Sequence, residues 1–139
     1  GLYDQFLIKD NHIDLVGSVS NAIARVVAYK KAHQLTSPIV VEVRNLREIA
    51  EALEWASEID RLLLDNFAPQ QVQRAVAYIG GRLPVEVSGG ITPQNARAYA
   101  EAGANYLSAG ALTHSAPALD ISLKIRHRGA GSGPALPPA

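Results

Sequence analysis

Polar residues that could do chemistry recur at nearly equal intervals along the chain. Glu42 and Asp65 lie 23 residues apart, Ser88 follows Asp65 by another 23, and Gly110 follows Ser88 by 22. Each lies at or just past the end of an apolar, β-rich run, where packing alone would favour Val, Ile or Leu. Paired carboxylates can hold sugar hydroxyls, a metal ion or positive charge that develops in a transition state. The alternative is a structural ion-pair network at the end of a sheet.

Two turns of small residues follow successive predicted strands and indicate an anion site. In the first, Ser88, Gly89 and Gly90 precede Thr92 and Pro93, which predict a helix N-cap and first helical residue. Glycines allow close approach to the backbone, and free N–H groups at a helix start favour a phosphate. The second turn, SAGALT, contains Gly110. Either turn alone is also compatible with ordinary loop chemistry.

Other ionisable residues lie near the same predicted strand ends. Lys9 ends an apolar strand, and its ammonium would point toward the two carboxylates. His12 and His114 are predicted in strand-end loops, where each is a ligand candidate although an isolated histidine is often a surface or core residue. Glu86 is predicted to be buried and to need a partner, which favours a structural role over a catalytic one. No spacing matches a zinc site, and metal ligands remain unknown.

The elements that position these residues alternate between strand and helix. Apolar runs predict strands over Gln5–Lys9, Ile39–Val43, Arg61–Asp65, Leu83–Ser88 and Asn105–Ala109. Helical spacing predicts helices over Val19–Gln34, Asn45–Trp55, Gln70–Tyr78, Pro93–Ala102 and Pro117–Arg126. This alternation predicts an α/β fold with parallel strands covered by helices. Because about eight strands close a barrel, five βα units predict the C-terminal portion of a (β/α) TIM-like barrel.

Composition limits the class of protein. The 139 residues suffice for one core, with 13 Lys plus Arg balancing 13 Asp plus Glu, so charge gives no argument for nucleic acid or an anionic membrane. The absence of cysteine favours an intracellular, cytoplasmic protein, and no apolar run is long enough to span a membrane. Residues 1–128 are predicted to form the partial barrel, and the Gly/Pro-rich segment 129–139 a disordered tail. The start at Gly1 predicts a piece of a longer protein.

Five segments together resemble the quinolinate phosphoribosyltransferase family, also called nicotinate-nucleotide pyrophosphorylase (carboxylating). They are LIKDNHI (Leu7–Ile13), VEV (Val41–Val43), LLLDNF (Leu62–Phe67), EVSGGIT (Glu86–Thr92) and SAGALTHSAPALDISLKI (Ser108–Ile125). The first and last are highly specific, whereas SGGI is shared with other phosphate-binding barrels. The resemblance implies an α/β barrel domain preceded by a smaller α/β domain, acting as a homo-oligomer (a dimer or larger).

The resemblance also implies a reaction in NAD biosynthesis. Family enzymes convert quinolinate and phosphoribosyl pyrophosphate, with Mg²⁺ accompanying the pyrophosphate, to nicotinate mononucleotide, pyrophosphate and CO₂. Carried over by motif, the catalytic residues are Lys9, Glu42 and Asp65. Lys9 would help to bind the substrates, and the two carboxylates would hold the ribose hydroxyls and stabilise oxocarbenium character. The 5′-phosphate would bind Ser88, Gly89, Gly90, Gly110 and His114, and His12 is a further substrate-binding candidate.

The chain departs from the family pattern in one absent cluster and in one replaced residue. The Arg/His/Lys cluster that grips quinolinate lies upstream of Gly1 in the family, so these residues alone are predicted to be inactive. Arg44 stands where an acidic residue is common in the family, on a predicted exposed loop. Two alternatives remain open: another phosphate-binding barrel enzyme, such as a thiamine-phosphate synthase-like protein, and a non-catalytic half-barrel that acts in assembly or regulation.

Overall fold

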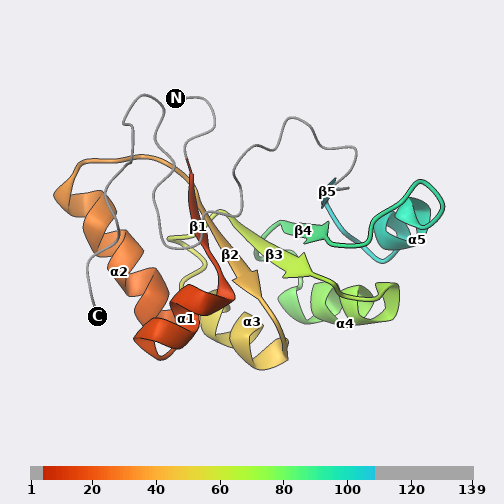
Figure 1. Ribbon diagram of the computed structural model, residues 1–139, viewed down its shortest axis with the longest axis horizontal. Helices are drawn as coiled ribbons and strands as arrows, with labels where there is room; N and C mark the ends of the chain where they lie inside the picture. Colours follow the sequence, from red (N-terminus) through yellow and green to blue (C-terminus); the bar gives the residue numbers. More distant parts are fainter. Residues whose placement is uncertain (1–4, 109–139) are drawn as a thin grey trace.

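The computed structural model describes residues 5–108, in which strands and helices alternate (Figure 1). The strands are β1 (Phe6–Ile8), β2 (Ile39–Val43), β3 (Arg61–Asp65), β4 (Val85–Ser88) and β5 (Tyr106–Ser108). The helices are α1 (Asp10–Val16), α2 (Val19–Ala32), α3 (Leu46–Leu53), α4 (Pro69–Ile79) and α5 (Ala96–Glu101). The alternation predicted from the sequence is confirmed over this range.

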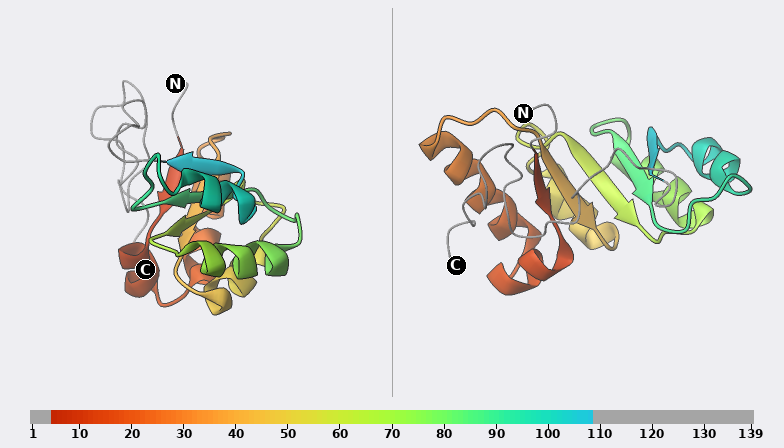
Figure 2. Two further views of the ribbon diagram at one scale, coloured as in Figure 1. Left: turned by 90° about the vertical axis from the view of Figure 1, so that its right-hand side faces the viewer. Right: turned by 45° about the horizontal axis from the view of Figure 1, so that its top comes forward.

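The strands form one parallel sheet in the order of the chain, β1-β2-β3-β4-β5. A right-handed crossover between each strand and the next places every connecting helix on the same side of such a sheet. The helices accordingly follow one another along one side, as the views in Figures 1 and 2 show. A doubly wound fold would reverse the strand order and cover both faces. The sequential order is that of a (β/α) barrel segment, as predicted.

The two faces of the sheet differ in composition because side chains alternate along each strand. The helix face carries apolar residues that pack against the helices in the main core, among them Phe6, Ile8, Val41, Leu64 and Val87. The opposite face, which we call the inner face, carries residues that strand register places side by side: Leu7 with Val40, Glu42 with Leu63 and Glu86, and Asp65 with Ser88. The inner face therefore becomes polar toward the carboxyl ends of the strands.

The predicted helices within residues 5–108 are present with ends shifted by at most three residues, and the structure differs most from the predictions at α1 and at the start of α5. Asp10–Val16 forms helix α1, whereas we expected a loop there; the turn starts at Lys9 and ends at Gly17, whose φ of 102° terminates it. Helix α5 begins at Ala96 rather than at Pro93. Thr92 still accepts an N–H hydrogen bond from Asn95 through its hydroxyl, at 3.2 Å, but it does so in a turn that precedes the helix. The predicted helix over 117–126 and the predicted tail lie outside the described residues.

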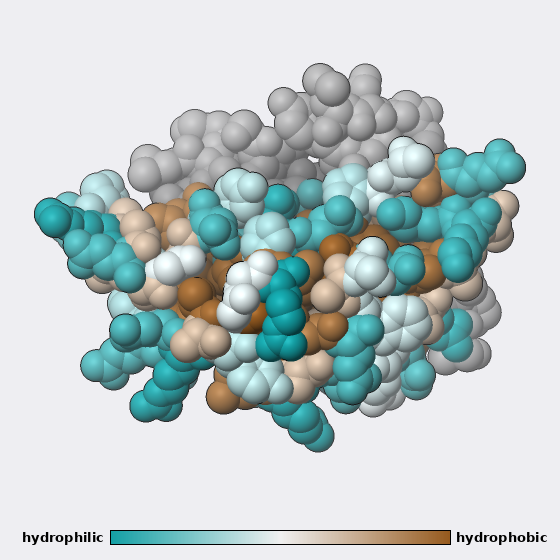
Figure 3. All heavy atoms as spheres, turned by 180° about the vertical axis from the view of Figure 1, so that it is seen from behind, coloured by the Kyte–Doolittle hydropathy of each residue, from teal (hydrophilic) through white to brown (hydrophobic). Residues whose placement is uncertain are grey.

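Part of the apolar surface remains accessible. Among the described residues, β1 pairs only with β2 and β5 only with β4, so the sheet has two open edges. Figure 3 shows, on the side opposite to the view of Figure 1, a band of hydrophobic residues bordered by hydrophilic side chains. Tyr106 on β5 is half-exposed. Within residues 5–108, no helix is long and apolar enough to cross a membrane.

Candidate functional site

Four residues from four successive strands line the carboxyl edge of the inner face. Lys9 directly follows β1, Glu42 is the penultimate residue of β2, and Asp65 and Ser88 end β3 and β4. The register pairs Asp65 with Ser88, and the Ser88 hydroxyl donates a hydrogen bond to Asp65 Oδ1 at 3.0 Å. Residues that are regularly spaced in the sequence are therefore neighbours in the structure, because each βα unit places one residue at the same edge of the sheet.

Glu42 and Asp65 form a carboxyl pair at this edge. Glu42 is 7% exposed, and its Oε1 has no hydrogen-bond partner among the described residues. Burial raises the pKa of Glu42 to about 7; the charges of Asp65 and Asp10 and a hydrogen bond with Asp65 add to the rise, whereas the Lys9 ammonium opposes it. A carboxyl group that titrates near neutral pH, with one oxygen unpartnered, is a candidate to bind a ligand.

The turn after β4 places two glycines in the left-handed region, with φ of 86° at Gly89 and 73° at Gly90. The Asn95 amide donates a hydrogen bond to the Gly90 carbonyl at 2.8 Å, and the Asn66 N–H donates one to the Ser88 carbonyl at 2.9 Å. Among the described residues, no acceptor pairs with the N–H of Gly89, Gly90 or Ile91. The turn is held from both sides, and its N–H groups are available for an anion.

The two glycines serve different purposes. A Cβ at Gly89 would lie 2.9 Å from Asp65 Oδ1 and still closer to Asn66 Oδ1, so this position is packed against the last residue of β3 and the residue after it. At Gly90, an added Cβ would meet no heavy atom within 4 Å. Gly89 thus lets the turn approach these side chains closely, and Gly90 leaves open space beside the backbone; the positive φ of each favours glycine.

Glu86 lies one layer below Ser88 on the inner face and has partners, as predicted. Its Oε1 forms an ion pair with Arg61 Nε at 2.8 Å, and its Oε2 accepts a short hydrogen bond from the Ser108 hydroxyl. The Arg61 guanidinium also lies 5.1 Å from the centroid of the Tyr106 ring. This buried layer ties β3, β4 and β5 together beneath the site and favours the structural interpretation of Glu86.

His12 lies in helix α1 rather than in the predicted loop, because its backbone N–H joins the first turn by bonding to the Lys9 carbonyl at 3.0 Å. The side chain is 1% exposed, and its Nδ1 has no hydrogen-bond partner among the described residues. Burial, with a smaller effect of the positive charge of Arg25, lowers the pKa of His12. Burial thus favours the neutral form of the ring. Gly110 and His114 lie outside the described residues.

Comparison with protein families identifies the family to which the chain belongs. A sequence model described as "Quinolinate phosphoribosyl transferase, C-terminal domain" matches residues 1–124. The chain belongs to the quinolinate phosphoribosyl transferase family. The resemblance in the five sequence segments is thereby confirmed, and the match includes all four residues at the carboxyl edge of the inner face.

Curated relatives carry names of the same family. A chloroplastic nicotinate-nucleotide pyrophosphorylase (carboxylating) of Oryza sativa subsp. japonica is 40% identical over 138 residues, covering 90% of this chain and 37% of the relative. A probable nicotinate-nucleotide pyrophosphorylase (carboxylating) of Methanocaldococcus jannaschii is 43% identical over 131 residues, covering 89% of this chain and 44% of the relative. The chain thus spans less than half the length of these relatives.

Solved structures of family members share the fold. The nicotinate-nucleotide pyrophosphorylase from Francisella tularensis matches with a TM-score of 0.67 at 36% identity, covering 80% of this chain and 38% of the other. The one from Ehrlichia chaffeensis gives a TM-score of 0.69 at 36% identity, covering 83% and 40% of the respective chains. Both likenesses agree with the barrel-type strand order of the sheet.

Sequence reasoning missed several residues that contact or surround the candidate site. Asn66 adopts a φ of 62° directly after Asp65, and Asn95 holds the Gly90 carbonyl. Asp10 adds negative charge near Glu42. The sequence did contain indications of the two asparagines, since asparagine after a strand often adopts the left-handed conformation and Thr-x-x-Asn is a turn pattern. Within residues 5–108, no group of three or more His, Asp or Glu side chains could hold a metal ion.

Proposed function

We propose that the protein carrying this chain is a quinolinate phosphoribosyltransferase that forms nicotinate mononucleotide, pyrophosphate and CO₂ from quinolinate and phosphoribosyl pyrophosphate. The observation that carries the proposal is the alignment of Lys9, Glu42, Asp65 and Ser88 along one edge, with the carboxyl pair directly beside a glycine turn. Such an edge offers neighbouring places for a phosphate and for the sugar attached to it. Family membership supports this interpretation.

The turn would receive the 5′-phosphate of the ribose. Ser88 has a hydroxyl at the edge, and the backbone of Gly89 and Gly90 offers N–H groups that no described residue accepts. Helix α5 starts only at Ala96, so the turn itself, rather than a helix N-terminus, would supply the donors. Gly110 and His114 are proposed to complete this phosphate site from the next strand end.

Glu42 and Asp65 would bind the ribose hydroxyls and stabilise the positive charge that develops at the anomeric carbon as pyrophosphate leaves. An oxocarbenium-like centre needs anionic neighbours in a site from which water is largely excluded. Asp65 accepts the Ser88 hydroxyl, which links the sugar side of the site to the phosphate side. Because the pKa of Glu42 is about 7, this role predicts that activity falls as the pH drops below 7.

Lys9 would supply a positive charge toward the substrates, and His12 would support the adjoining wall. Quinolinate carries two carboxylates, whose planar recognition calls for forked arginine donors. Most described arginines lie on helices, on connections or at the amino end of β3: Arg25, Arg47, Arg61, Arg74, Arg82 and Arg97. Arg44 is occupied by Asp14 and Glu48. We therefore propose that the residues gripping quinolinate lie in another part of the full protein or in a neighbouring subunit.

Three further points belong to the proposal. Mg²⁺ would enter bound to the pyrophosphate oxygens of the substrate, since Mg²⁺ commonly uses phosphates together with few protein groups. The full protein would be a homo-oligomer, a dimer or larger. We also propose a cytoplasmic location, although relatives from Arabidopsis thaliana and Nicotiana glauca are named chloroplastic and mitochondrial.

The decisive experiment measures CO₂ release from carboxyl-labelled quinolinate by the full-length protein. We expect release only when phosphoribosyl pyrophosphate and Mg²⁺ are both present, with one nicotinate mononucleotide formed per CO₂. The 139-residue chain alone should show none. Phosphoribosyl pyrophosphate binding without turnover by the full protein would favour another phosphate-binding barrel enzyme, and a failure to bind either substrate would favour a non-catalytic assembly module.

A further inference from the structure

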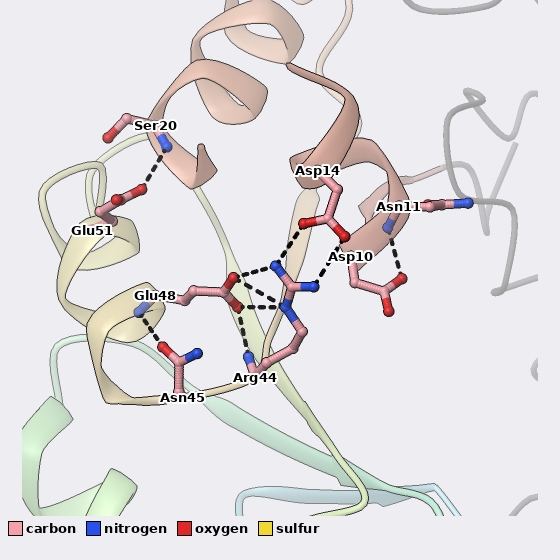
Figure 4. A network of polar contacts seen from close by, with 8 residues as sticks. All are labelled: Asp10, Asn11, Asp14, Ser20, Arg44, Asn45, Glu48 and Glu51. Atoms are coloured by element: carbon pink, nitrogen blue, oxygen red, sulfur yellow. Dashed lines mark hydrogen bonds and ion pairs between the residues drawn. The ribbon is translucent and has the colours of Figure 1, made fainter. Parts of the chain in front are cut away.

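Arg44, the first residue after β2, bridges carboxylates from two different helices (Figure 4). Its Nη2 lies 3.0 Å from Asp14 Oδ1 in α1 and 2.6 Å from Glu48 Oε2 in α3. Its Nη1 donates to Asp14 Oδ2 at 3.2 Å, and its Nε donates to both oxygens of Glu48, at 3.2 and 3.1 Å. Both carboxylates are therefore held in two-pronged contacts, the geometry in which arginine orients its partners best.

The Glu48 side of this bridge is buried. The Glu48 side chain is 6% exposed, and its Oε1 also accepts the backbone N–H of Arg44 at 2.8 Å. The N–H of Glu48 in turn donates to the N-cap side chain of Asn45 at 2.9 Å. A buried carboxylate needs a charged partner, and Arg44 supplies it. Both the backbone and the side chain of Arg44 are thus fixed where β2 turns into α3.

The Asp14 side connects the bridge to the candidate site. Helix α1 is a short helix whose N-cap is Lys9, and the Lys9 carbonyl accepts the N–H groups of His12 and Ile13 at 3.0 and 3.1 Å. Asp14 follows immediately on the same helix. Arg44, at the other end of the bridge, is two residues from Glu42. Through Asp14, the guanidinium joins the segment that carries Lys9 to the segment that carries Glu42.

We propose that Arg44 is a positioning residue, which sets the separation of the Lys9 ammonium and the Glu42 carboxyl by fixing α1 to the β2–α3 turn. Its effect on turnover rests on the proposed function, whereas its effect on the Lys9–Glu42 pair does not. Burial and the charges of Asp65 and Asp10 raise the pKa of Glu42, and the Lys9 ammonium lowers it. Release of α1 should let Lys9 move away, and the pKa of Glu42 should then rise.

The test uses the full-length protein and three variants. Asp14→Asn removes the charge and one of the two acceptor oxygens on the α1 side of the bridge, at an exposed position, and leaves the buried Arg44–Glu48 pair in place. The double variant Arg44→Gln/Glu48→Gln removes the bridge without leaving a buried charge unpaired. Arg44→Lys keeps the charge but loses the fork. Arg97→Gln, which breaks the exposed pair with Glu101 on α5, is the matched control.

Two readouts separate positioning from structural support. In protein labelled with ¹³C at the glutamate carboxyl carbons, the Glu42 resonance is assigned by its loss in Glu42→Gln and titrated without substrates. We expect the pKa of Glu42 to rise by about 0.5 in Asp14→Asn and by more in the double variant. Misplacement of the pair should also lower kcat/KM for phosphoribosyl pyrophosphate about fivefold and move the acid limb of its pH profile upward. Arg44→Lys should be intermediate, and Arg97→Gln unchanged.

An unchanged Glu42 titration in Asp14→Asn and in the double variant, even with a lower melting temperature, would overturn the proposal and make the bridge structural only. If the wild-type protein has no turnover, the proposed function fails, but the titration still decides the role of Arg44. If the titration shifts and kcat/KM does not, Arg44 positions the pair without any consequence for turnover, and the proposed effect of Arg44 on turnover is overturned.

Discussion

Replacement of Glu42 by glutamine should make the protein more stable at alkaline pH. Burial raises the pKa of Glu42 to about 7 from the 4.5 of an ordinary glutamate. Since one pH unit corresponds to about 1.4 kcal/mol, ionisation of this carboxyl costs the folded state about 3 kcal/mol. Glutamine keeps the shape of the protonated acid and never ionises. The native residue is thus retained at a cost in stability, as expected of a functional group.

The direction of the effect follows from the two pKa values. Below pH 4.5, Glu42 is protonated in both the folded and the unfolded protein, and its ionisation costs nothing. As the pH rises from 4.5 to about 7, the unfolded chain gives up the proton while the folded chain keeps it, so the free energy of unfolding falls. Above about pH 7, both states are ionised and the full cost is present.

The assay is urea-induced unfolding of wild-type and Glu42→Gln protein between pH 5 and pH 8. We expect a difference in the free energy of unfolding of less than about 1 kcal/mol at pH 5, growing to about 3 kcal/mol in favour of the variant at pH 8. Glu101→Gln is the control, because the Glu101 side chain is 66% exposed and paired only at the surface. A difference that stays constant with pH, or that favours the wild type at pH 8, would refute the reasoning.

Three further predictions concern the site. Glu42→Gln and Asp65→Asn should each lower kcat on the order of 10²-fold in the full-length protein, because each removes a carboxylate that would stabilise positive charge in the transition state. An unchanged kcat would show that the two carboxylates are structural. Gly90→Ala should weaken phosphoribosyl pyrophosphate binding more than quinolinate binding in calorimetric titrations, because its methyl group would stand beside the N–H groups of the turn and would strain a residue with a φ of 73°. Equal weakening of both would count against a phosphate there. Glu86→Leu should destabilise the fold by about 3 kcal/mol in thermal melts, because Arg61 loses its carboxylate partner. A variant as stable as the wild type would show that the layer of Arg61, Glu86 and Ser108 contributes little to stability.

The sequence predicted the strands well because each buried run contains almost only β-branched and apolar residues. The bounds of β2 and β3 agree with the predictions, and the other strands differ by at most two residues at an end within the described range. The short helices were harder to predict. Helix α1 has only two buried residues, His12 and Ile13, so no apolar period revealed it, and its strongly polar start resembled a loop.

The parts of the candidate site that depend on the order of the strands could be predicted from the sequence. The parts that depend on contacts between loops could not. Regular spacing placed Glu42, Asp65 and Ser88 on adjacent strand ends, because each βα unit has nearly the same length. The clash that an added Cβ at Gly89 would have with Asp65 and Asn66 depends on the close approach of two loops, which no spacing reveals. A Gly89→Val variant would therefore clash within the site before any ligand binds, whereas a substitution at Gly90 meets no heavy atom within 4 Å and adds only the strain of its positive φ.

The sequential order of the strands has a consequence for how the site comes into existence. Because each strand pairs with the one made just before it, every unit can dock on its predecessor as the chain leaves the ribosome. The edge would then be assembled in the order of synthesis, Lys9 first and Ser88 last. Nascent chains of increasing length should acquire the Glu42–Asp65 pair before the glycine turn that follows β4, so premature termination would leave the proposed sugar-binding residues without the proposed phosphate-binding turn.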